Sequence, residues 1–356
     1  MNGRNWNNGQ WALAVTLAAG LVACGGGGGG GLPPQSAATI DVSAANRDSL
    51  SHATAVGIMA ISPVDAIPLG AGGLAAGRES AQAVTSATPQ AWLGRLVALA
   101  RQGSTAHARP AGKSLERALA LIGPIEEPCT LSGTMTLMLD DRDNSASESN
   151  GDVFTMVFRN CKESDSDMLN GAVTTTFTEV GSSSFGGRMV FAQLLDSTAN
   201  HSVTLNGAAR LAFSQPSSTE EITSMTADGD VVATVQTHLF TDTVTLLSGF
   251  VSQASYSASV TRPGSTVPEG RTLSTVSGSL NSVAAGGIVE VSTVASQPIA
   301  SYGDDAYPSA GVVQVRGMRG TLLLTGLSVD TVRLDLDTND DGSFESSQNV
   351  TWDWLL

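Results

Sequence analysis

Apolar and polar residues alternate along most of the chain after Cys129. Apolar side chains occupy every second position from 135 to 139 and again from 154 to 158, while Ser and Thr fill many of the positions between such residues. A period of two is the signature of strands with one buried face. Short turn signals such as Asp228-Gly229 separate the runs without intervening helical patterns, which favours antiparallel meanders. The sequence therefore predicts an antiparallel β domain over residues 129–356.

A loose repeat runs through this domain. An apolar residue, a mostly polar residue and a glycine recur six times before or within an alternating run, and glycine in a strand permits a bulge or a sharp bend. The uneven spacing suits bent strands in one curved sheet better than the blades of a propeller. We therefore expect a mainly β fold, either a large curved antiparallel sheet or an open barrel-like meander. The six glycines are Gly133, Gly171, Gly207, Gly249, Gly278 and Gly317.

Helical periodicity replaces the alternation before Cys129, so we expect a helical and loop region over 43–128. Its clearest helix begins at Thr88-Pro89 and ends at Gly103, with Trp92, Leu96 and Leu99 on one apolar face. A second helix is expected from Ser114 to Ile122, where Gly123-Pro124 stops it, and a weaker one from Ser43 to about Ala60. Residues 61–86 between them read as loop.

The first 23 residues have the form of an export signal. A polar start with Arg4 is followed by an apolar run, Trp11 to Ala23, that is too short to span a bilayer as a helix. The run ends in Leu21-Val22-Ala23-Cys24, which resembles the lipobox of bacterial lipoproteins. That resemblance implies cleavage before Cys24 and acylation of its side chain, so that the mature chain is membrane-anchored without spanning.

A tether over residues 24–42 is expected to follow the lipid. Seven glycines, Gly25 to Gly31, behave as flexible chain. In Gram-negative lipoproteins an aspartate after the lipidated cysteine favours retention in the inner membrane, and this chain has Gly25 there. The resemblance therefore implies the outer membrane, with the protein facing the periplasm or the cell surface.

The charge and the cysteine content limit the kinds of partner to expect and indicate the cellular compartment. The formal net charge is −15, and such a surface repels nucleic acid and anionic lipid headgroups, so a nucleic-acid partner is not expected. Of three cysteines, Cys24 is expected to carry lipid. Cys129 and Cys161 remain, and in the oxidising periplasm we expect them to form a disulfide.

The best candidate for site chemistry is the acidic segment Asp337-Thr338-Asn339-Asp340-Asp341-Gly342-Ser343-Phe344-Glu345. Oxygen-bearing side chains at alternate positions, with glycine sixth, resemble the start of an EF-hand calcium loop. Gln348 stands at the twelfth position in place of a bidentate Glu, and no helices flank the segment. The alternative is an acidic hairpin turn, since Asp, Asn and Gly favour turns. The expected calcium ligands are Asp337, Asn339, Asp341, Ser343 and Glu345.

Two further segments have plainer explanations. Asp140 to Asn144, with Glu148 and Asp152, is expected to form a solvated hairpin tip, and its spacing fits a calcium site less well. Val350, Trp352, Trp354 and Leu356 alternate with other residues and predict a terminal strand. Its tryptophan stripe could bind sugars or lipid, although paired tryptophans more often belong to a core.

Enzyme signatures fail on inspection, and no catalytic residue is predicted. The four histidines lack metal-ligand spacing, and neither a G-x-S-x-G nor an H-E-x-x-H motif occurs. The chain resembles uncharacterised β-rich lipoproteins of Gram-negative bacteria, which supplies no activity. Three hypotheses remain: a non-enzymatic structural or binding lipoprotein stabilised by calcium, a carrier of a hydrophobic ligand in which the Trp92 helix covers a curved sheet, and, third, a hydrolase.

Overall fold

The computed structural model describes residues 37–61, 122–129, 131–143, 149–162, 168–181, 183–197, 201–303, 305 and 307–356. The expected export signal, Cys24, the glycine tether as far as residue 36 and the expected helix over 88–103 lie outside these ranges. The helices and strands are α1 Arg47–Ala60, β1 Ile122–Pro128, β2 Ser132–Asp140, β3 Val153–Lys162, β4 Met168–Val180, β5 Ser184–Ser197, β6 His201–Ser217, β7 Glu220–Ala227, β8 Val231–Thr237, β9 Thr241–Leu246, β10 Val251–Ser257, β11 Arg271–Ser282, β12 Gly287–Thr293, β13 Ile299–Tyr302, β14 Gly311–Arg316, β15 Thr321–Ser328, β16 Thr331–Asp337, β17 Ser346–Thr351 and α3 Trp352–Leu355.

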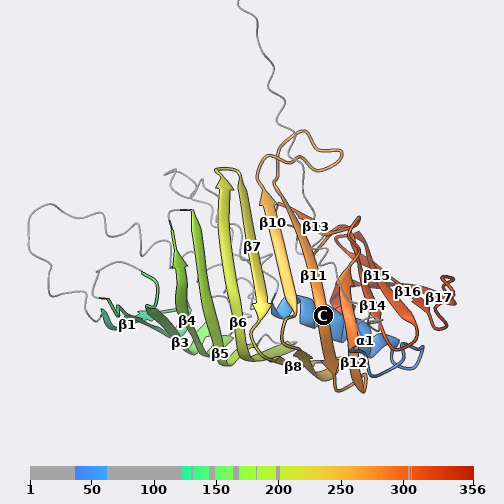
Figure 1. Cartoon of the computed structure of the whole chain (residues 1–356), viewed down its shortest axis with the longest axis horizontal. Helices are drawn as coiled ribbons and strands as arrows, with labels where there is room; N and C mark the ends of the chain where they lie inside the picture. The colour runs from blue at the N-terminus through green and yellow to red at the C-terminus, as the bar shows by residue number, and fades with distance from the viewer. Residues whose placement is uncertain are drawn as a thin grey trace, which may run out of the picture. The chain divides into compact units, whose positions relative to one another are not determined.

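Within the described residues the strands join in one 17-stranded sheet, and the paired strands run antiparallel (Figure 1). The alternation seen in the sequence is also seen in burial: along β7 and β9 every second side chain is buried. The prediction of a mainly β fold with a large curved antiparallel sheet is confirmed.

Two long strands pass through both halves of this sheet. Residues 201–206 of β6 pair with β8, whereas residues 209–217 pair with β7. In β11, residues 271–277 pair with β10, and residues 280–282 pair with β9. Because β7 pairs with β10 and β8 with β9, these six strands form a hydrogen-bonded circuit that divides the sheet into a β7–β10 side and a β8–β9 side.

A line of bends, called the crease below, separates the two sides. It follows positions where the backbone has positive φ, a conformation that glycine adopts without steric cost. Most of these positions lie within strands, whereas Gly229 and Gly249 lie in the connections from β7 to β8 and from β9 to β10. Gly171 shows why the residue type matters, because a Cβ there would lie 2.1 Å from the carbonyl oxygen of Gln193. The positions on the crease are Gly133, Asn160, Gly171, Gln193, Gly207, Gly229, Gly249 and Gly278.

Five of the six glycines in the sequence repeat lie on the crease, which explains why the repeat occurs. Gly317 is the exception, since its φ is not among the positive ones. A Cβ on Gly317 would lie 2.5 Å from the carbonyl oxygen of Ile40. This glycine therefore permits close approach of the N-terminal segment and does not bend a strand.

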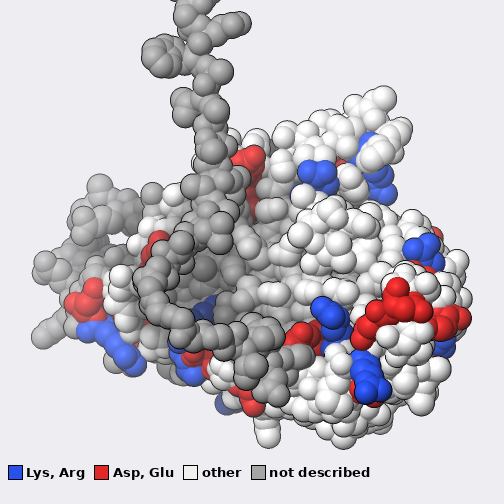
Figure 2. All heavy atoms as spheres, turned by 45° about the vertical axis from the view of Figure 1, so that its right-hand side comes forward, with Lys and Arg blue, Asp and Glu red and all other residues white. Residues whose placement is uncertain are grey.

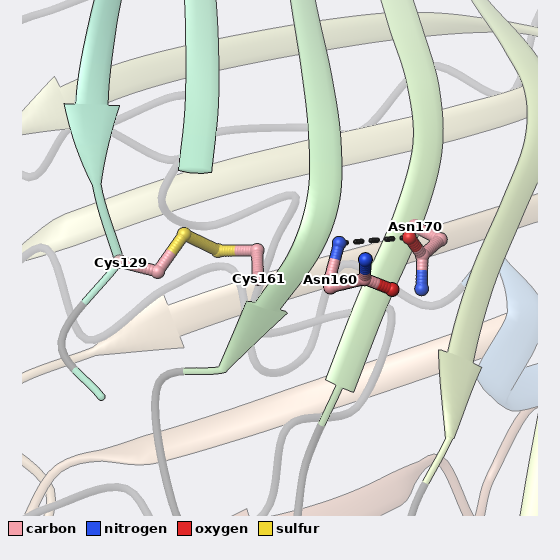
Figure 3. The surroundings of a disulfide bond; sticks show 4 residues. All are labelled: Cys129, Asn160, Cys161 and Asn170. Atoms are coloured by element: carbon pink, nitrogen blue, oxygen red, sulfur yellow. Dashed lines mark hydrogen bonds between the residues drawn. A yellow bond between two sulfur atoms is a disulfide. The ribbon is translucent and has the colours of Figure 1, made fainter. Parts of the chain in front are cut away.

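Asparagine side chains complete the bends between the glycines. Asn160 has φ of 47°, and its backbone N–H donates to Oδ1 of Asn170 at 2.8 Å (Figure 3). Gln193 has φ of 49°, and its N–H donates to Oδ1 of Asn206 at 2.9 Å. In both cases a bulge withdraws a donor from the strand ladder, and the Asn that precedes a crease glycine satisfies it.

Helix α1 packs against β8, β9, β11 and α3. Small residues allow it to approach the sheet closely: a Cβ on Gly57 would lie 2.6 Å from Cδ1 of Leu280. Leu50, Ala53 and Ile61 are almost fully buried. The prediction of a helix ending near Ala60 is confirmed, with its start at Arg47.

Two expectations for chain segments are wrong. Residues Ile122–Pro128 form the strand β1 and pair with β2, so the strands begin before Cys129 and Ile122 does not end a helix. The prolines of β1 fit because, among the described residues, β1 has a defined register with β2 alone, and an edge strand tolerates residues without an N–H. The expected terminal tryptophan strand ends at Thr351, whose hydroxyl accepts the N–H of Trp354 and starts the short helix α3.

Candidate functional site

The acidic segment predicted from the sequence connects β16 to β17. Asp337 ends β16 and is 4% exposed. One of its carboxylate oxygens accepts the backbone N–H groups of Asn339 and Asp340, and the other accepts that of Gly342 at 2.9 Å. These bonds wrap the chain around the Asp337 carboxylate.

Three of the expected ligands are brought together by this wrapping. Asp337, Asp341 and Glu345 each offer a carboxylate oxygen, and these oxygens lie within 4.8 Å of one another. Gly342 has φ of 84°, which is the conformation expected of the glycine at the sharp turn. The other two expected ligands, Asn339 and Ser343, also lie in the loop, where Oδ1 of Asn339 accepts the N–H of Asp341 and Oδ1 of Asp341 accepts the N–H of Ser343.

Asp340, between the candidate ligands, serves another purpose. Its carboxylate accepts the N–H of Gly320 at 2.9 Å and the hydroxyl of Thr321 at 3.2 Å. It thereby fastens the acidic segment to the turn between β14 and β15. This role was not predicted, because it depends on a residue about twenty positions away.

The charge around the loop is mixed. Figure 2 shows acidic side chains gathered on the side of the molecule that carries the last strands, with basic side chains beside them. Arg333 pairs with Asp335 at 2.7 Å, and the hydroxyl of Ser347 donates to the same carboxylate. Asp335 is thus neutralised within the hairpin, whereas the three clustered carboxylates of the loop form no ion pair with Lys or Arg within the described ranges. A bound divalent cation would compensate that charge.

The second acidic segment is built around Asp152, which is fully buried. Its two oxygens accept the N–H groups of Arg142 and Ser149, at 2.9 Å and 2.8 Å. It holds the two ends of the β2–β3 connection together, although Asp141 and Asp143 also lie near its carboxylate. Residues 144–148, including Glu148, are outside the described ranges.

Cys129 and Cys161 form a disulfide, with Cα atoms 5.4 Å apart (Figure 3). The bond joins the end of β1 to the end of β3, next to the crease residue Asn160. Both cysteines are buried. The predicted pairing is confirmed.

An aromatic cluster at the C-terminus was not predicted. The imidazole of His52 in α1 stacks on Phe240, with ring centroids 4.1 Å apart, and lies 4.4 Å from the ring of Trp354. Its Nδ1 lies 3.1 Å from the carbonyl oxygen of Leu355. Burial lowers the pKa of His52, opposed by this hydrogen bond and by the charges of Asp48 and Asp242. The cluster packs α3 against α1. The sequence signal for it is a histidine among the apolar residues of the α1 segment.

Comparison with protein families, curated proteins and solved structures found no match. None of the helices in the described ranges is both long and apolar enough to cross a membrane.

Proposed function

We propose that the protein is a lipid-anchored, non-enzymatic lipoprotein of the outer membrane with a structural or binding role, and that calcium bound by the loop Asp337–Glu345 stabilises it. The observation that carries the first part is the sequence Leu21-Val22-Ala23-Cys24 at the end of a short apolar run. The support for the second part is the convergence of three carboxylates on a loop that is already wrapped around Asp337.

The anchor predicts where the protein is found. Two or three acyl chains on a cysteine such as Cys24 anchor a protein stably in a bilayer, since each buried methylene contributes about 0.8 kcal/mol. The full-length protein should sediment and float with outer-membrane vesicles after a salt wash. A Cys24→Ala variant should lose this behaviour, and a variant that still floats with the vesicles would rule the lipid anchor out.

The calcium site is tested by the melting temperature of the purified full chain with EGTA and with millimolar calcium chloride. A ligand that binds only the folded state, at one hundred times its Kd, stabilises by about 2.7 kcal/mol. We expect calcium to raise the melting temperature of the wild type and leave that of Asp341→Asn unchanged. An unchanged wild-type melting temperature would exclude the site.

Asp340→Asn is the matched control, because Asp340 lies in the same loop but bonds to Gly320 and Thr321. This variant should melt at a lower temperature than the wild type in EGTA. It should keep the increase caused by calcium, because the three clustered carboxylates remain. Loss of the calcium effect in both variants would mean that the effect reports only the conformation of the loop.

A carrier of a hydrophobic ligand is the second candidate, supported by the apolar face of the sheet. Met156, Val173 and Phe191 stand opposite one another on β3, β4 and β5, and each is at most 3% exposed. The row continues from Leu137 on β2. Native mass spectrometry of the full chain, purified without chelator, separates the candidates: a co-purified lipid of defined mass favours the carrier, and a chelator-sensitive increment matching calcium favours the first proposal.

A further inference from the structure

Four turns at one end of the sheet each present an exposed apolar side chain. Strand register places these turns at the same end: Ser282 pairs with Val244, Glu290 with Arg316 and Thr321 with Asp337. The turns connect β8 to β9, β11 to β12, β14 to β15 and β16 to β17, and we call them together the four-turn rim. Their exposed side chains are Leu239 (49% exposed), Val283 (67%), Met318 (58%) and Phe344 (44%).

The N-terminal segment enters the fold at this rim. The N–H of Thr39 donates to the carbonyl of Ile288, and the N–H of Val42 donates to the carbonyl of Arg319. Between these bonds the N–H of Met318 donates to the carbonyl of Ile40 at 2.8 Å. Glycines make the close approach possible, since a Cβ on Gly287 would lie 2.6 Å from Ile40 Cγ2. The chain that leads from Cys24 is therefore fixed to the rim by backbone hydrogen bonds.

Chain length limits how far the rim can lie from the lipid. The residues from Cys24 to Ser36 can span at most about 45 Å, the length of a fully extended chain of that many residues. Single exposed apolar residues need no explanation, but this group lies where the expected tether ends and joins the sheet. Leu327 provides a comparison for the rim residues. It is also a large apolar residue, 45% exposed, but it lies at the opposite end of β15.

Basic side chains flank the apolar residue on the β14–β15 turn. Arg316 and Arg319 lie on either side of Met318 and are exposed, and neither forms an ion pair with another residue of the described part of the chain. An apolar side chain between two arginines suits the headgroup layer, where phosphates meet acyl chains. The net charge of −15 opposes strongly anionic bilayers, so the contact depends mainly on apolar insertion.

We propose that the four-turn rim rests on the phospholipid bilayer that holds the lipid anchor, with Val283 and Met318 inserted among the headgroups. This proposal rests on the proposed lipidation of Cys24. It gives the module a fixed orientation, with the β15–β16 turn and Leu327 directed away from the membrane.

The test is spin labelling of the full lipidated chain in phosphatidylcholine vesicles. Cys24 is acylated under the proposal and Cys129 is bonded to Cys161, so one introduced cysteine supplies the only reactive thiol. Nitroxide is attached to Met318→Cys and, in a separate variant, to Val283→Cys. Leu327→Cys is the matched control, with similar native exposure at the other end of β15. Collision with dissolved oxygen and with a water-soluble nickel chelate is measured for each, together with flotation of the protein with the vesicles.

We expect the labels at 318 and 283 to lose accessibility to the nickel chelate and to gain accessibility to oxygen when the protein is on vesicles, with neither change at 327. Equal accessibility at 318 and 327 in a protein that floats with the vesicles would overturn the rim contact and leave the anchor standing. Failure of the lipidated chain to float would overturn both.

Discussion

The side chain of Asn170 in β4 accepts the backbone N–H of Asn160 in β3, with 2.8 Å between the two atoms. Gly171 follows Asn170 directly and has φ of 101°. The bulge of β3 at Asn160 thus obtains the acceptor for its displaced N–H from β4, while β2 supplies the glycine that makes room, since a Cβ on Gly133 would collide with the Asn160 carbonyl. The bulge of β5 at Gln193 repeats the arrangement, with Asn206 on β6 as the acceptor and Gly171 on β4 as the glycine that makes room.

Substitution at Gly171 should therefore destabilise the fold severely. A Cβ there would lie 2.1 Å from the carbonyl oxygen of Gln193, in addition to the cost of about 1–2 kcal/mol for a left-handed backbone with a side chain. We expect Gly171→Ala to lower the free energy of unfolding by more than about 2 kcal/mol, measured by urea titration.

Gly249 provides the control on the same crease. Its φ is 87°, but a Cβ would meet nothing within 4 Å. Gly249→Ala should lower the free energy of unfolding only by the cost of placing a side chain on a left-handed backbone, about 1–2 kcal/mol. Equal losses for the two variants would show that close packing across the crease does not matter.

The disulfide should stabilise the fold by reducing the conformational entropy of the unfolded chain. It joins residues separated by 32 positions, and closing a loop of that size stabilises by roughly 3–4 kcal/mol in the chain-entropy model. The Cys129→Ala/Cys161→Ala variant should show a loss of that order in denaturant titration. A reducing agent should lower the stability of the wild type and leave the variant unchanged.

Stability should fall in mildly acidic solution because of His52. Burial between Phe240 and Trp354 lowers its pKa in the folded state, whereas the unfolded chain has the ordinary value of about 6.5. The unfolded state thus binds the proton more readily, so stability is full above about pH 6.5 and declines as the pH falls toward the lower folded pKa. Comparing melting temperatures at pH 7.5 and 5.5, the drop should be larger in the wild type than in His52→Phe.

Ionisation of Tyr307 should lower the stability of the fold at alkaline pH, whereas protonation of His52 lowers it at acidic pH. Burial and the hydrogen bond to Asp353, at 2.8 Å, raise the pKa of Tyr307 to about 12. Because the unfolded phenol ionises near pH 10, its contribution is complete below pH 10 and is lost as the pH rises toward 12. Tyr307→Phe should remove this part of the alkaline transition in a pH titration of stability. An identical alkaline transition in both proteins would contradict the assignment.

Local patterns were sufficient for the parts of the fold that depend on neighbouring residues. Period-two alternation predicted the strands, and the recurring glycines predicted the bends at Gly133, Gly171 and Gly207, because glycine adopts a positive φ without steric cost. The convergence of carboxylates in the acidic loop was also predictable, since these side chains and the turn glycine lie within nine consecutive positions.

The features that the sequence did not reveal depend on contacts between residues that are far apart in the chain. Gly317 has the same local signature as the crease glycines, yet it makes room for Ile40, which is far away in the chain. At the C-terminus the alternating tryptophans suggested a strand, but Thr351 caps a helical turn and Trp352 stacks on Tyr307. Thr followed by Asp two positions later was a helix-start signal that the alternation outweighed.

The proposed lipid at Cys24 determines where the protein is held, and mass spectrometry of the N-terminal peptide of the mature protein tests its presence directly. The protein is isolated from membranes with detergent and digested. We predict a first peptide that begins at Cys24 and carries the mass of diacylglycerol, with or without a third acyl chain. A mature protein that begins at another residue, or an unmodified Cys24, would contradict the account.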